Sequence, residues 1–482
     1  MLIIGSGFSG LGMGIRLQRA GLDSFAILER AGEVGGTWRD NRYPGCACDV
    51  QSHLYSFSFE PNPDWSHRYA PQPEIRAYLE RCAQKYGMGP HLRFGAEVTA
   101  ARYDEDAAVW QVETGDGRRF RAPVLVSGMG GLRRPAVPAI EGLERFEGPA
   151  FHSAQWDEGF DFADKRVAVI GTGASAVQFV PHLAPRVRRL DLYQRTPPWI
   201  IPRRDRPFRP FERALFRRVP LVQRLLRAYL YGSAESVAVA FVLTPRAMKL
   251  AERLARRHLA RSVADPELRA RLTPDYTLGC KRVLLSDDYY PAVARANVEL
   301  VTDPIREVQP SGVVTAGGRL READAIVYGT GFRTQDPIER GVVFGRGGLD
   351  LVDAWSEGPE AYLGTTVHGF PNLFLLVGPN TGLGHSSIVY MIESQVQYVM
   401  EALRAMRARG LREVEVRAEV QRRFNEDLRR RHRRTVWSSG CRSWYLRADG
   451  RNTTLWPGFT FGFRWRTRAF RLADYRVAGP PA

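Results

Sequence analysis

The stretch Met1-Leu-Ile-Ile-Gly5-Ser-Gly7-Phe-Ser-Gly10 determines the fold of the N-terminal part of the chain. An apolar run enters glycines spaced G-x-G-x-x-G, and Leu11 to Ala20 then carry apolar side chains at helical period, so we expect a strand, a tight turn and a helix. The next apolar run, Ser24 to Leu28, ends in Glu29, at the spacing of the acid that holds a ribose diol. This βαβ unit predicts a site for FAD or NAD, with the pyrophosphate at the helix N-terminus. Its candidate ligands are Gly5, Gly7, Phe8, Ser9, Gly10 and Glu29.

A second unit begins at Arg166-Val-Ala-Val-Ile-Gly171-Thr-Gly173-Ala-Ser-Ala176. The strand after it, Arg189 to Gln194, ends in Arg195-Thr196 instead of an acid, and a guanidinium pairs well with a 2′-phosphate. This unit therefore predicts an NADP site. Its candidate ligands are Gly171, Thr172, Gly173, Ala174, Ser175, Ala176, Arg195 and Thr196. Two such units with different ribose preferences imply electron transfer between a flavin and a nicotinamide.

The predicted fold class is α/β, with two Rossmann-like dinucleotide-binding domains for FAD and NADP. We expect residues 1–140 to form the first part of the FAD domain, 141–320 the NADP domain, and 321–482 the second part of the FAD domain with a C-terminal lid. Two late strands, 323–327 and 372–377, are expected to complete the FAD domain. An Arg-rich helical insertion at about 203–274 has an apolar face that either packs on its parent domain or meets a membrane surface or a partner. That face includes Leu221, Leu225, Tyr229 and Leu230.

The 482-residue chain carries a formal net charge of +17, but its arginines are spread along the whole sequence and accompany no recognition motif. We therefore expect no nucleic-acid partner. The five cysteines are odd in number and far apart, which argues against a disulfide framework and indicates a reducing, cytoplasmic compartment. No metal site and no transmembrane segment are expected, whereas peripheral membrane contact stays open.

Between the two units lies Phe146-x-Gly148-x-x-x-His152-x-x-x-Trp156-Asp157. This pattern resembles the fingerprint of type I Baeyer–Villiger monooxygenases, class B flavoprotein monooxygenases within the flavin-containing monooxygenase superfamily. Relatives that oxidise nitrogen and sulfur usually carry Phe or Tyr in place of the Trp. Further segments are similar to the same family, namely Gly35-Gly36-Thr37-Trp38, Arg42-Tyr43-Pro44-Gly45 leading to Asp49, His53-Leu54-Tyr55, and Lys281-Arg282 before Asp288-Tyr289-Tyr290.

The resemblance implies an NADPH-consuming oxidoreductase that uses FAD and O₂ to convert a ketone or aldehyde to an ester or lactone through a C4a-peroxyflavin. It places Gly36, Thr37, Trp38, Asp49 and Tyr55 near the flavin and the backbone of Val98 at the adenine, and it assigns Arg195, Thr196 and Lys281 to the 2′-phosphate. Arg282 matches the catalytic arginine, with Asp49 as its expected partner. A fixed cation stabilises a peroxyanion and the anionic adduct, and arginine stays protonated there.

His152 lies in the linker between the domains and is expected to have a structural or coupling role. His385 follows a glycine-rich turn, and it either hydrogen-bonds near the flavin ring or caps the next helix. The Trp- and Gly-rich C-terminal end is expected to form a loop-rich lid or to pack in the core. Only Met1 to Ile4 precede Gly5, fewer residues than the resemblance implies, so we expect the natural chain to start upstream.

Two other functions stay open at this point. The first is an N- or S-oxidising flavin-containing monooxygenase, which Trp156, Asp157 and Arg282 disfavour. The second is a non-catalytic flavin-binding protein on a membrane surface, docked by the basic insertion. A disulfide reductase also has two nucleotide units, but the chain lacks the redox C-x-x-C motif that it needs.

Overall fold

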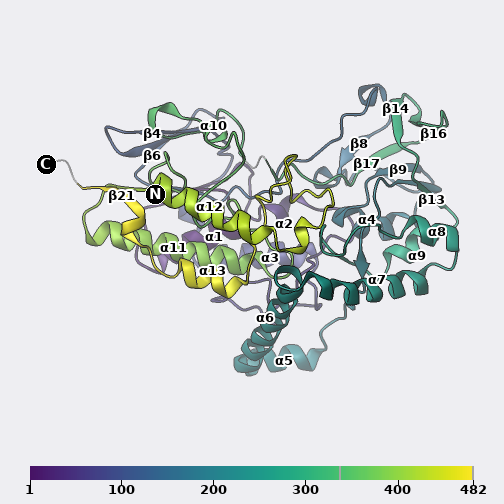
Figure 1. The fold of residues 1–482 in the computed structure, drawn as a ribbon, viewed down its shortest axis with the longest axis horizontal. Coiled ribbons are helices and arrows are strands. Elements are labelled where there is room, and N and C mark those ends of the chain that lie inside the picture. The colour runs from purple at the N-terminus through teal and green to yellow at the C-terminus, as the bar shows by residue number, and fades with distance from the viewer. Residues whose placement is uncertain (336–337, 480–482) are drawn as a thin grey trace.

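The computed structural model describes residues 1–335 and 338–479, so residues 336–337 and 480–482 of the predicted third segment lie outside the described part. The first sheet is parallel, with strand order β19-β7-β1-β2-β3. Its strands are β1 (Leu2–Ile4), β2 (Ala26–Leu28), β3 (Leu92–Arg93), β7 (Leu125–Ser127) and β19 (Leu373–Leu375). The buried faces of α1 (Phe8–Gln18) and α11 (Ile388–Ala408) share one core with it (Figure 1). The N-terminal strand forms where the opening motif predicts it, and it is an inner strand of this sheet.

The second sheet is also parallel, in the order β13-β10-β9-β17-β8. It is built from β8 (Ala150–His152), β9 (Arg166–Ile170), β10 (Arg189–Tyr193), β13 (Val298–Val301) and β17 (Ala325–Tyr328), and it packs with α4 (Ala174–Leu183) and α9 (Tyr289–Val293). The α/β class with two Rossmann-like sheets is confirmed.

The prediction that strand 323–327 completes the first sheet is wrong, because β17 pairs with β9 and β8 of the second sheet. Asp324 explains the placement: its carboxylate accepts hydrogen bonds from the Arg166 backbone N at 2.7 Å and from the Arg166 guanidinium at 2.6 Å. The start of β17 is thereby fixed to the start of β9. The second sheet consequently extends past residue 320, and β19 is the late strand that joins the first sheet.

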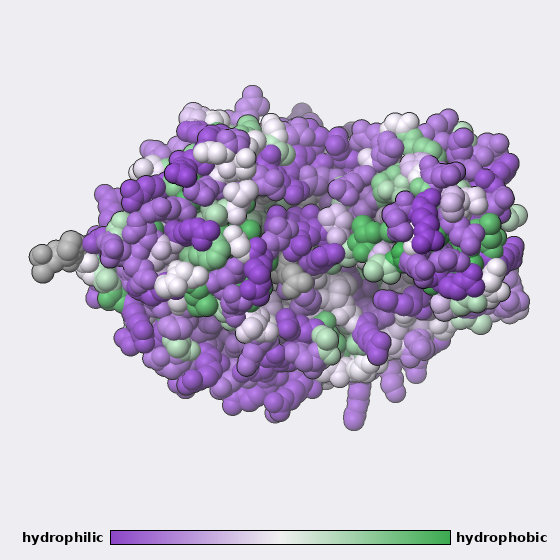
Figure 2. Space-filling model, turned by 90° about the horizontal axis from the view of Figure 1, so that it is seen from above, coloured by the Kyte–Doolittle hydropathy of each residue, from purple (hydrophilic) through white to green (hydrophobic). Residues whose placement is uncertain are grey.

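Smaller sheets flank these two layers. They comprise β4 (Val98–Asp104), β5 (Val109–Thr114), β6 (Arg119–Ala122) and β18 (Val343–Phe344) in one sheet, and β14 (Ile305–Gln309), β15 (Gly312–Thr315) and β16 (Leu320–Glu322) in another. Two strand pairs are β11 (Ile200–Ile201) with β12 (Leu284–Leu285), and β20 (Glu413–Val416) with β21 (Tyr475–Ala478). The other helices outside the insertion are α2 (Thr37–Asp40), α3 (Gln72–Lys85), α10 (Leu351–Ala354), α12 (Ala418–His432) and α13 (Thr460–Thr467). Seen from above, the surface is mostly hydrophilic, with separate hydrophobic patches (Figure 2).

The range predicted as a helical insertion forms α5 (Pro210–Arg218), α6 (Pro220–Val242), α7 (Met248–Ser262) and α8 (Pro266–Arg271). Three of these helices begin at a proline, which suits the first helical turn because its N–H has no partner there. Figure 1 shows α5 and α6 projecting below the body of the molecule. Leu230 is buried, but Leu221, Leu225 and Tyr229 are exposed, so most of the predicted apolar face does not pack on the parent domain.

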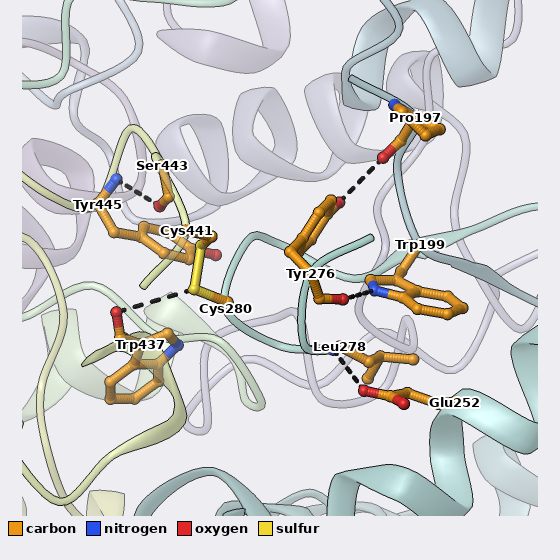
Figure 3. Close-up of a disulfide and its surroundings, with 10 residues drawn as sticks. All are labelled: Pro197, Trp199, Glu252, Tyr276, Leu278, Cys280, Trp437, Cys441, Ser443 and Tyr445. Carbon is orange, nitrogen blue, oxygen red and sulfur yellow. Dashed lines mark hydrogen bonds between the residues drawn. A yellow bond between two sulfur atoms is a disulfide. The ribbon is translucent and has the colours of Figure 1, made fainter. Parts of the chain in front are cut away.

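A disulfide joins Cys280 to Cys441, with the two Cα atoms 6.2 Å apart (Figure 3). The number and spacing of the cysteines, which argued against a disulfide framework, did not predict this bridge. The two residues are 161 positions apart in sequence, and they meet because the C-terminal segment folds back onto the loop after Tyr276. The disulfide also removes the argument from cysteine usage for a reducing, cytoplasmic compartment. Of the helices described, none is long and apolar enough to cross a membrane.

Candidate functional site

The first cavity lies where β1 and β2 end, and the G-x-G-x-x-G turn forms its floor. Gly5 has φ +90°, a conformation that only glycine adopts without strain. A Cβ on Gly36 would lie 3.0 Å from the Gly7 Cα, so the two glycine turns face each other at close range. The α1 N-cap, Gly7, has no side-chain partner, which leaves the backbone N–H groups of the first turn free for an anion. These features fit a dinucleotide pyrophosphate.

Most residues that sequence reasoning assigned to this unit line the first cavity. They are Gly5, Gly7, Phe8, Ser9, Glu29, Gly36, Thr37, Trp38, Tyr55 and Val98. Gly10 does not line it, because Gly10 instead packs against the Gly5 carbonyl, with no room for a Cβ. Its role is close helix–strand packing, which is what the third glycine of this motif does.

Glu29 is buried at the edge of this cavity, at the place predicted for the ribose acid. Its carboxylate accepts hydrogen bonds from Ser6 N at 2.9 Å, Ser6 Oγ at 2.7 Å, Ala31 N at 3.0 Å and Arg39 Nη1 at 2.8 Å. Burial alone would raise the pKa of Glu29, but the bonds from Ala31 and Ser6 and the charge of Arg39 outweigh it and hold that pKa below its ordinary value. The acid is therefore ionised and fixed by the protein itself.

An aromatic wall separates the first cavity from a second, larger one of about 1150 Å³. Trp38 Nε1 donates a hydrogen bond to Tyr55 Oη at 3.0 Å, and both side chains line both cavities. Burial raises the pKa of Tyr55, so the phenol stays protonated. Because Thr37 and Val377 also line both cavities, a ligand in the first cavity can present one end to the second.

The second nucleotide unit opens into this larger cavity. Gly171 has φ +104°, and the lining residues include Gly171, Thr172, Gly173, Ala174, Ser175, Arg195, Thr196, Lys281 and Arg282. Ala176 lies behind the turn against Gly329. Neither Arg195 nor Lys281 forms an ion pair with a carboxylate of the described residues, and Lys281 Nζ lies 4.6 Å from the centre of the Tyr276 ring. Burial and the neighbouring Arg195 lower the pKa of Lys281. Two unneutralised cations at this position fit a 2′-phosphate.

Arg282 and Asp49 meet in the wall of the larger cavity. Arg282 donates to Asp49 Oδ2 from Nε at 2.8 Å and from Nη2 at 2.5 Å, as the resemblance led us to expect. The charge of Asp49 raises the pKa of the Arg282 guanidinium, outweighing the effect of burial. The remaining nitrogen, Nη1, has only a long contact of 3.4 Å to the Leu383 carbonyl. Arg282 is thus a permanent cation whose Nη1 is not held by Asp49.

Tyr445 is a residue of this site that sequence reasoning did not assign. It is fully buried beside Arg282, and the two groups interact although they do not meet the geometry of a hydrogen bond. Burial raises the pKa of Tyr445, against the opposing charge of Arg282. The disulfide holds this contact, since Cys280 precedes Lys281-Arg282 and Cys441 precedes Tyr445 by four residues. Figure 3 shows Trp437 and Tyr445 beside the disulfide. The adjacent Trp444 lines the larger cavity.

The residues of the fingerprint line neither cavity. They form the junction of β8 with the second sheet. A Cβ on Gly148 would collide with the Asp324 carbonyl. Phe146 packs in the core beside β17, and Trp156 stacks on Phe162. Asp157 accepts a hydrogen bond from Gly159 N at 2.9 Å. His152 is buried, and its Nδ1 accepts from Ala154 N at 3.1 Å. These contacts support the structural role expected for His152.

His385 does not take either role expected for it. Ser387, not His385, caps α11 by accepting a hydrogen bond from Val389 N, and His385 is absent from the lining of both cavities. Its buried ring faces α6, with Nε2 3.5 Å from Glu235 Oε1. Glu235 in turn accepts from Thr460 N at 2.9 Å and Thr460 Oγ1 at 2.6 Å. His385 therefore links the loop beside Arg282 to the insertion.

The larger cavity takes lining residues from the segment around Arg282 and from the C-terminal end, and none from the described residues of the insertion. No described residue of 203–274 lines the larger cavity, whereas Tyr276, Trp444, Thr454 and Leu455 do. The inner face of α6 instead packs against the first domain, where Gln223 donates to the Asn62 carbonyl at 2.7 Å and Arg227 donates to the His53 carbonyl at 2.6 Å. The insertion is attached to the site from outside.

Comparison with known proteins gives a consistent picture. Residues 2–208 match the family model described as pyridine nucleotide-disulphide oxidoreductase. The chain is 57% identical over 481 residues, 99% of its length and 91% of the relative's, to a Baeyer-Villiger monooxygenase of Pseudomonas aeruginosa. The crystal structure of OTEMO in complex with FAD and NADP superposes with a TM-score of 0.89 at 29% identity, covering 99% of both chains. The closed crystal structure of cyclohexanone monooxygenase gives 0.89 at 30% identity, covering 99% of this chain and 98% of that one.

Proposed function

The chain belongs to the family of Baeyer–Villiger monooxygenases, and from this premise we propose that it consumes NADPH and O₂ to insert one oxygen atom next to the carbonyl of a ketone or aldehyde. The product is an ester or a lactone. FAD, when bound in the first cavity, supplies the redox chemistry by accepting hydride from NADPH and passing electrons to O₂. The glycine cradle, the ionised Glu29 and the aromatic wall of Trp38 and Tyr55 are the residues that hold it.

The observation that carries the proposal is the Arg282–Asp49 pair in the wall of the larger cavity, which Trp38 and Tyr55 of the aromatic wall also line. Negative charge develops on oxygen when a peroxide attacks a carbonyl, and a fixed donor beside that oxygen lowers the barrier. Asp49 accepts from Nε and Nη2 and so orients the guanidinium, and Nη1, with only the long bond to the Leu383 carbonyl, is the nitrogen proposed to donate to the substrate. Because its pKa is raised, Arg282 keeps this proton throughout the reaction.

The second unit supports NADPH as the electron donor. Arg195 and Lys281 supply charge-assisted donors for a 2′-phosphate, and the free N-terminus of α4 faces the same cavity. Lys281, proposed to bind the nucleotide, and Arg282, proposed for catalysis, are adjacent in the chain. A change in the position of one therefore changes the position of the other. Occupation of the nucleotide site would therefore bear directly on the position of Arg282.

The test is Arg282→Ala in the holoenzyme, assayed with NADPH, O₂ and a panel of cyclic, aryl and linear ketones. We expect flavin reduction by NADPH to persist, ester or lactone to fall about 100-fold, and hydrogen peroxide to rise. Arg319→Ala, on an exposed turn, is the matched control and should behave as the parent enzyme. Unchanged ester formation by Arg282→Ala would overturn the proposed role. Sulfoxide or N-oxide as the main product of the parent enzyme would instead favour the other oxidising function.

A further inference from the structure

The insertion carries most of the excess positive charge of the molecule. Residues 203–274 contain 17 Lys and Arg against six Asp and Glu, so this segment accounts for +11 of the net charge of +17. The remaining 410 residues of the chain share the other +6. Arginine usage across the whole protein does not explain a concentration of this kind. Because the insertion lines no part of the larger cavity, the charge is not used to hold the nucleotide.

The outer face of α6 is apolar and open to solvent. Leu221, Leu225 and Tyr229 follow one another at intervals of four residues, with 61%, 61% and 71% of their surfaces exposed. Val239 and Leu243 continue the same side of the helix. Between Arg227 and the end of α6 the single charged residue is Glu235, and it is buried against Thr460. A solvent-facing helix of a globular protein is ordinarily polar on this side.

This outer face is held rigidly in its exposed orientation. On the opposite side of α6, Gln223 bonds the Asn62 carbonyl, Arg227 bonds the His53 carbonyl and Ser56, and Glu235 bonds Thr460. The helix therefore cannot turn its leucines inward without breaking four hydrogen bonds between distant parts of the chain. The exposed apolar side chains are a fixed feature of the surface.

Cations surround the apolar face and are not neutralised by the protein. Arg218, Arg224, Arg246, Lys249 and Arg253 are all exposed, and none forms an ion pair with a described carboxylate. Further exposed apolar side chains lie on the flanking helices, at Phe211 and Leu215 on α5 and at Leu250 and Leu254 on α7. Figure 1 shows α5 and α6 standing clear of the body, so a flat surface can approach them.

We propose that the outer face of α5, α6 and the start of α7 docks on the surface of an anionic phospholipid bilayer. The leucines and Tyr229 would enter the interfacial layer, while the unpaired arginines would meet lipid phosphates. A second copy of this chain would place one insertion with a net charge of +11 against another with the same charge, and like charges facing each other across an interface are unfavourable. A nucleic acid would use the arginines but leave the leucines exposed to water. Of these three partners, the bilayer surface alone offers phosphates to the arginines and an apolar layer to the leucines.

The test is flotation of the FAD-loaded full chain with vesicles of phosphatidylcholine alone and of phosphatidylcholine mixed with phosphatidylglycerol. We expect binding to the anionic vesicles at low salt, loss of binding as salt is raised, and little binding to neutral vesicles. Arg218→Glu with Arg224→Glu should lower the vesicle partition coefficient at least about tenfold, since each basic residue near the surface contributes about 1 kcal/mol. Leu221→Ser with Leu225→Ser should also lower it at least about tenfold.

The matched control is Arg119→Glu with Arg319→Glu, which changes the net charge equally on β6 and on the turn before β16, both at the top of Figure 1. We expect the control to bind anionic vesicles as the parent does, and all three variants to oxidise NADPH normally. Equal losses in the control and in the α5–α6 variants would overturn the proposal, as would parent enzyme that does not float. Self-association that disappears with the leucine substitutions would assign the face to a second copy and would also overturn it.

Discussion

The two nucleotide-binding units begin alike and end differently. Both place a glycine with positive φ after the first strand, Gly5 at +90° and Gly171 at +104°, and both start a helix that has no side-chain cap. The first unit ends in Glu29, which four hydrogen bonds from the protein already satisfy. The second ends in Arg195, which has no acidic partner among the described residues and lies beside Lys281.

This difference separates a preformed site from one that its ligand completes. The first unit is neutralised and rigid before any ligand arrives, which suits a cofactor that stays bound. The second holds uncompensated charge that a ligand phosphate would neutralise, which suits a nucleotide that binds and leaves. The contrast is testable, and the largest effect is expected in the first unit.

Gly10→Ala should abolish flavin binding. The new Cβ would collide with the Gly5 carbonyl, which belongs to the backbone and cannot move without breaking the turn. The second unit offers the natural control, because Ala176 occupies the same motif position there. Ala176→Gly should retain flavin and lose about 1 kcal/mol of stability, the usual cost of glycine in a helix. Flavin absorbance per chain and thermal unfolding measure both. A yellow, fully loaded Gly10→Ala protein would contradict the rigid packing of the first unit.

Cys441→Ser should disturb the second unit more than the first. The disulfide fixes the residue before Lys281-Arg282 to the C-terminal segment, and no comparable tie is described in the first unit. Loss of a bridge over so long a loop typically costs about 2–4 kcal/mol. We expect a lower unfolding temperature, a higher KM for NADPH and more hydrogen peroxide per NADPH, at unchanged flavin content. Cys82→Ser, at a free buried cysteine, is the control. Dithiothreitol should reproduce the effect in the parent enzyme and leave Cys441→Ser unaffected.

Arg195→Ala and Lys281→Ala should each raise the KM for NADPH about 10- to 100-fold, because a hydrogen bond to a charged phosphate contributes about 1.5–3 kcal/mol. The KM for NADH, which lacks the phosphate, should change little. The ratio of the two constants is therefore the measurement, and it separates loss of the phosphate site from general damage. Equal increases for both nucleotides would contradict the assignment of these two cations to the 2′-phosphate.

The two units also show which features of the fold and the site the sequence could predict. The glycine turns and the residues that end β2 and β10 are local features, and the structure puts them where their spacing indicates. Asp49 and Arg282 lie 233 positions apart, and only the resemblance to a family brought them together in advance. The sheet that β17 joins depends on the Asp324–Arg166 bonds, and the Cys280–Cys441 bridge depends on how the C-terminal segment folds back. The spacing of residues along a chain does not indicate such long-range contacts. For the same reason the sequence did not identify Tyr445 as a residue of the site.

The smallest predicted effect concerns pH and the ionised Glu29. Its pKa is lower in the folded protein than its ordinary value of 4.5, so the unfolded chain takes up the proton first as the solution is acidified. The stability that Glu29 contributes is therefore complete above about pH 4.5 and is lost progressively below it. Unfolding by denaturant between about pH 6 and about pH 3 measures this slope.

Glu29→Gln should flatten that slope by up to one proton, because the amide cannot titrate. The second unit has no corresponding acid at the end of β10 and makes no such contribution. The exposed Glu144→Gln serves as the control for loss of one carboxylate and should keep the parent slope. A neutral amide still accepts from Ser6 and Ala31, but it no longer balances the buried Arg39. Glu29→Gln should consequently also release flavin more readily at neutral pH. An unchanged slope would mean that the pKa of Glu29 is the same in the folded and the unfolded chain, and the first unit would then not be the neutralised, preformed site that its four hydrogen bonds indicate.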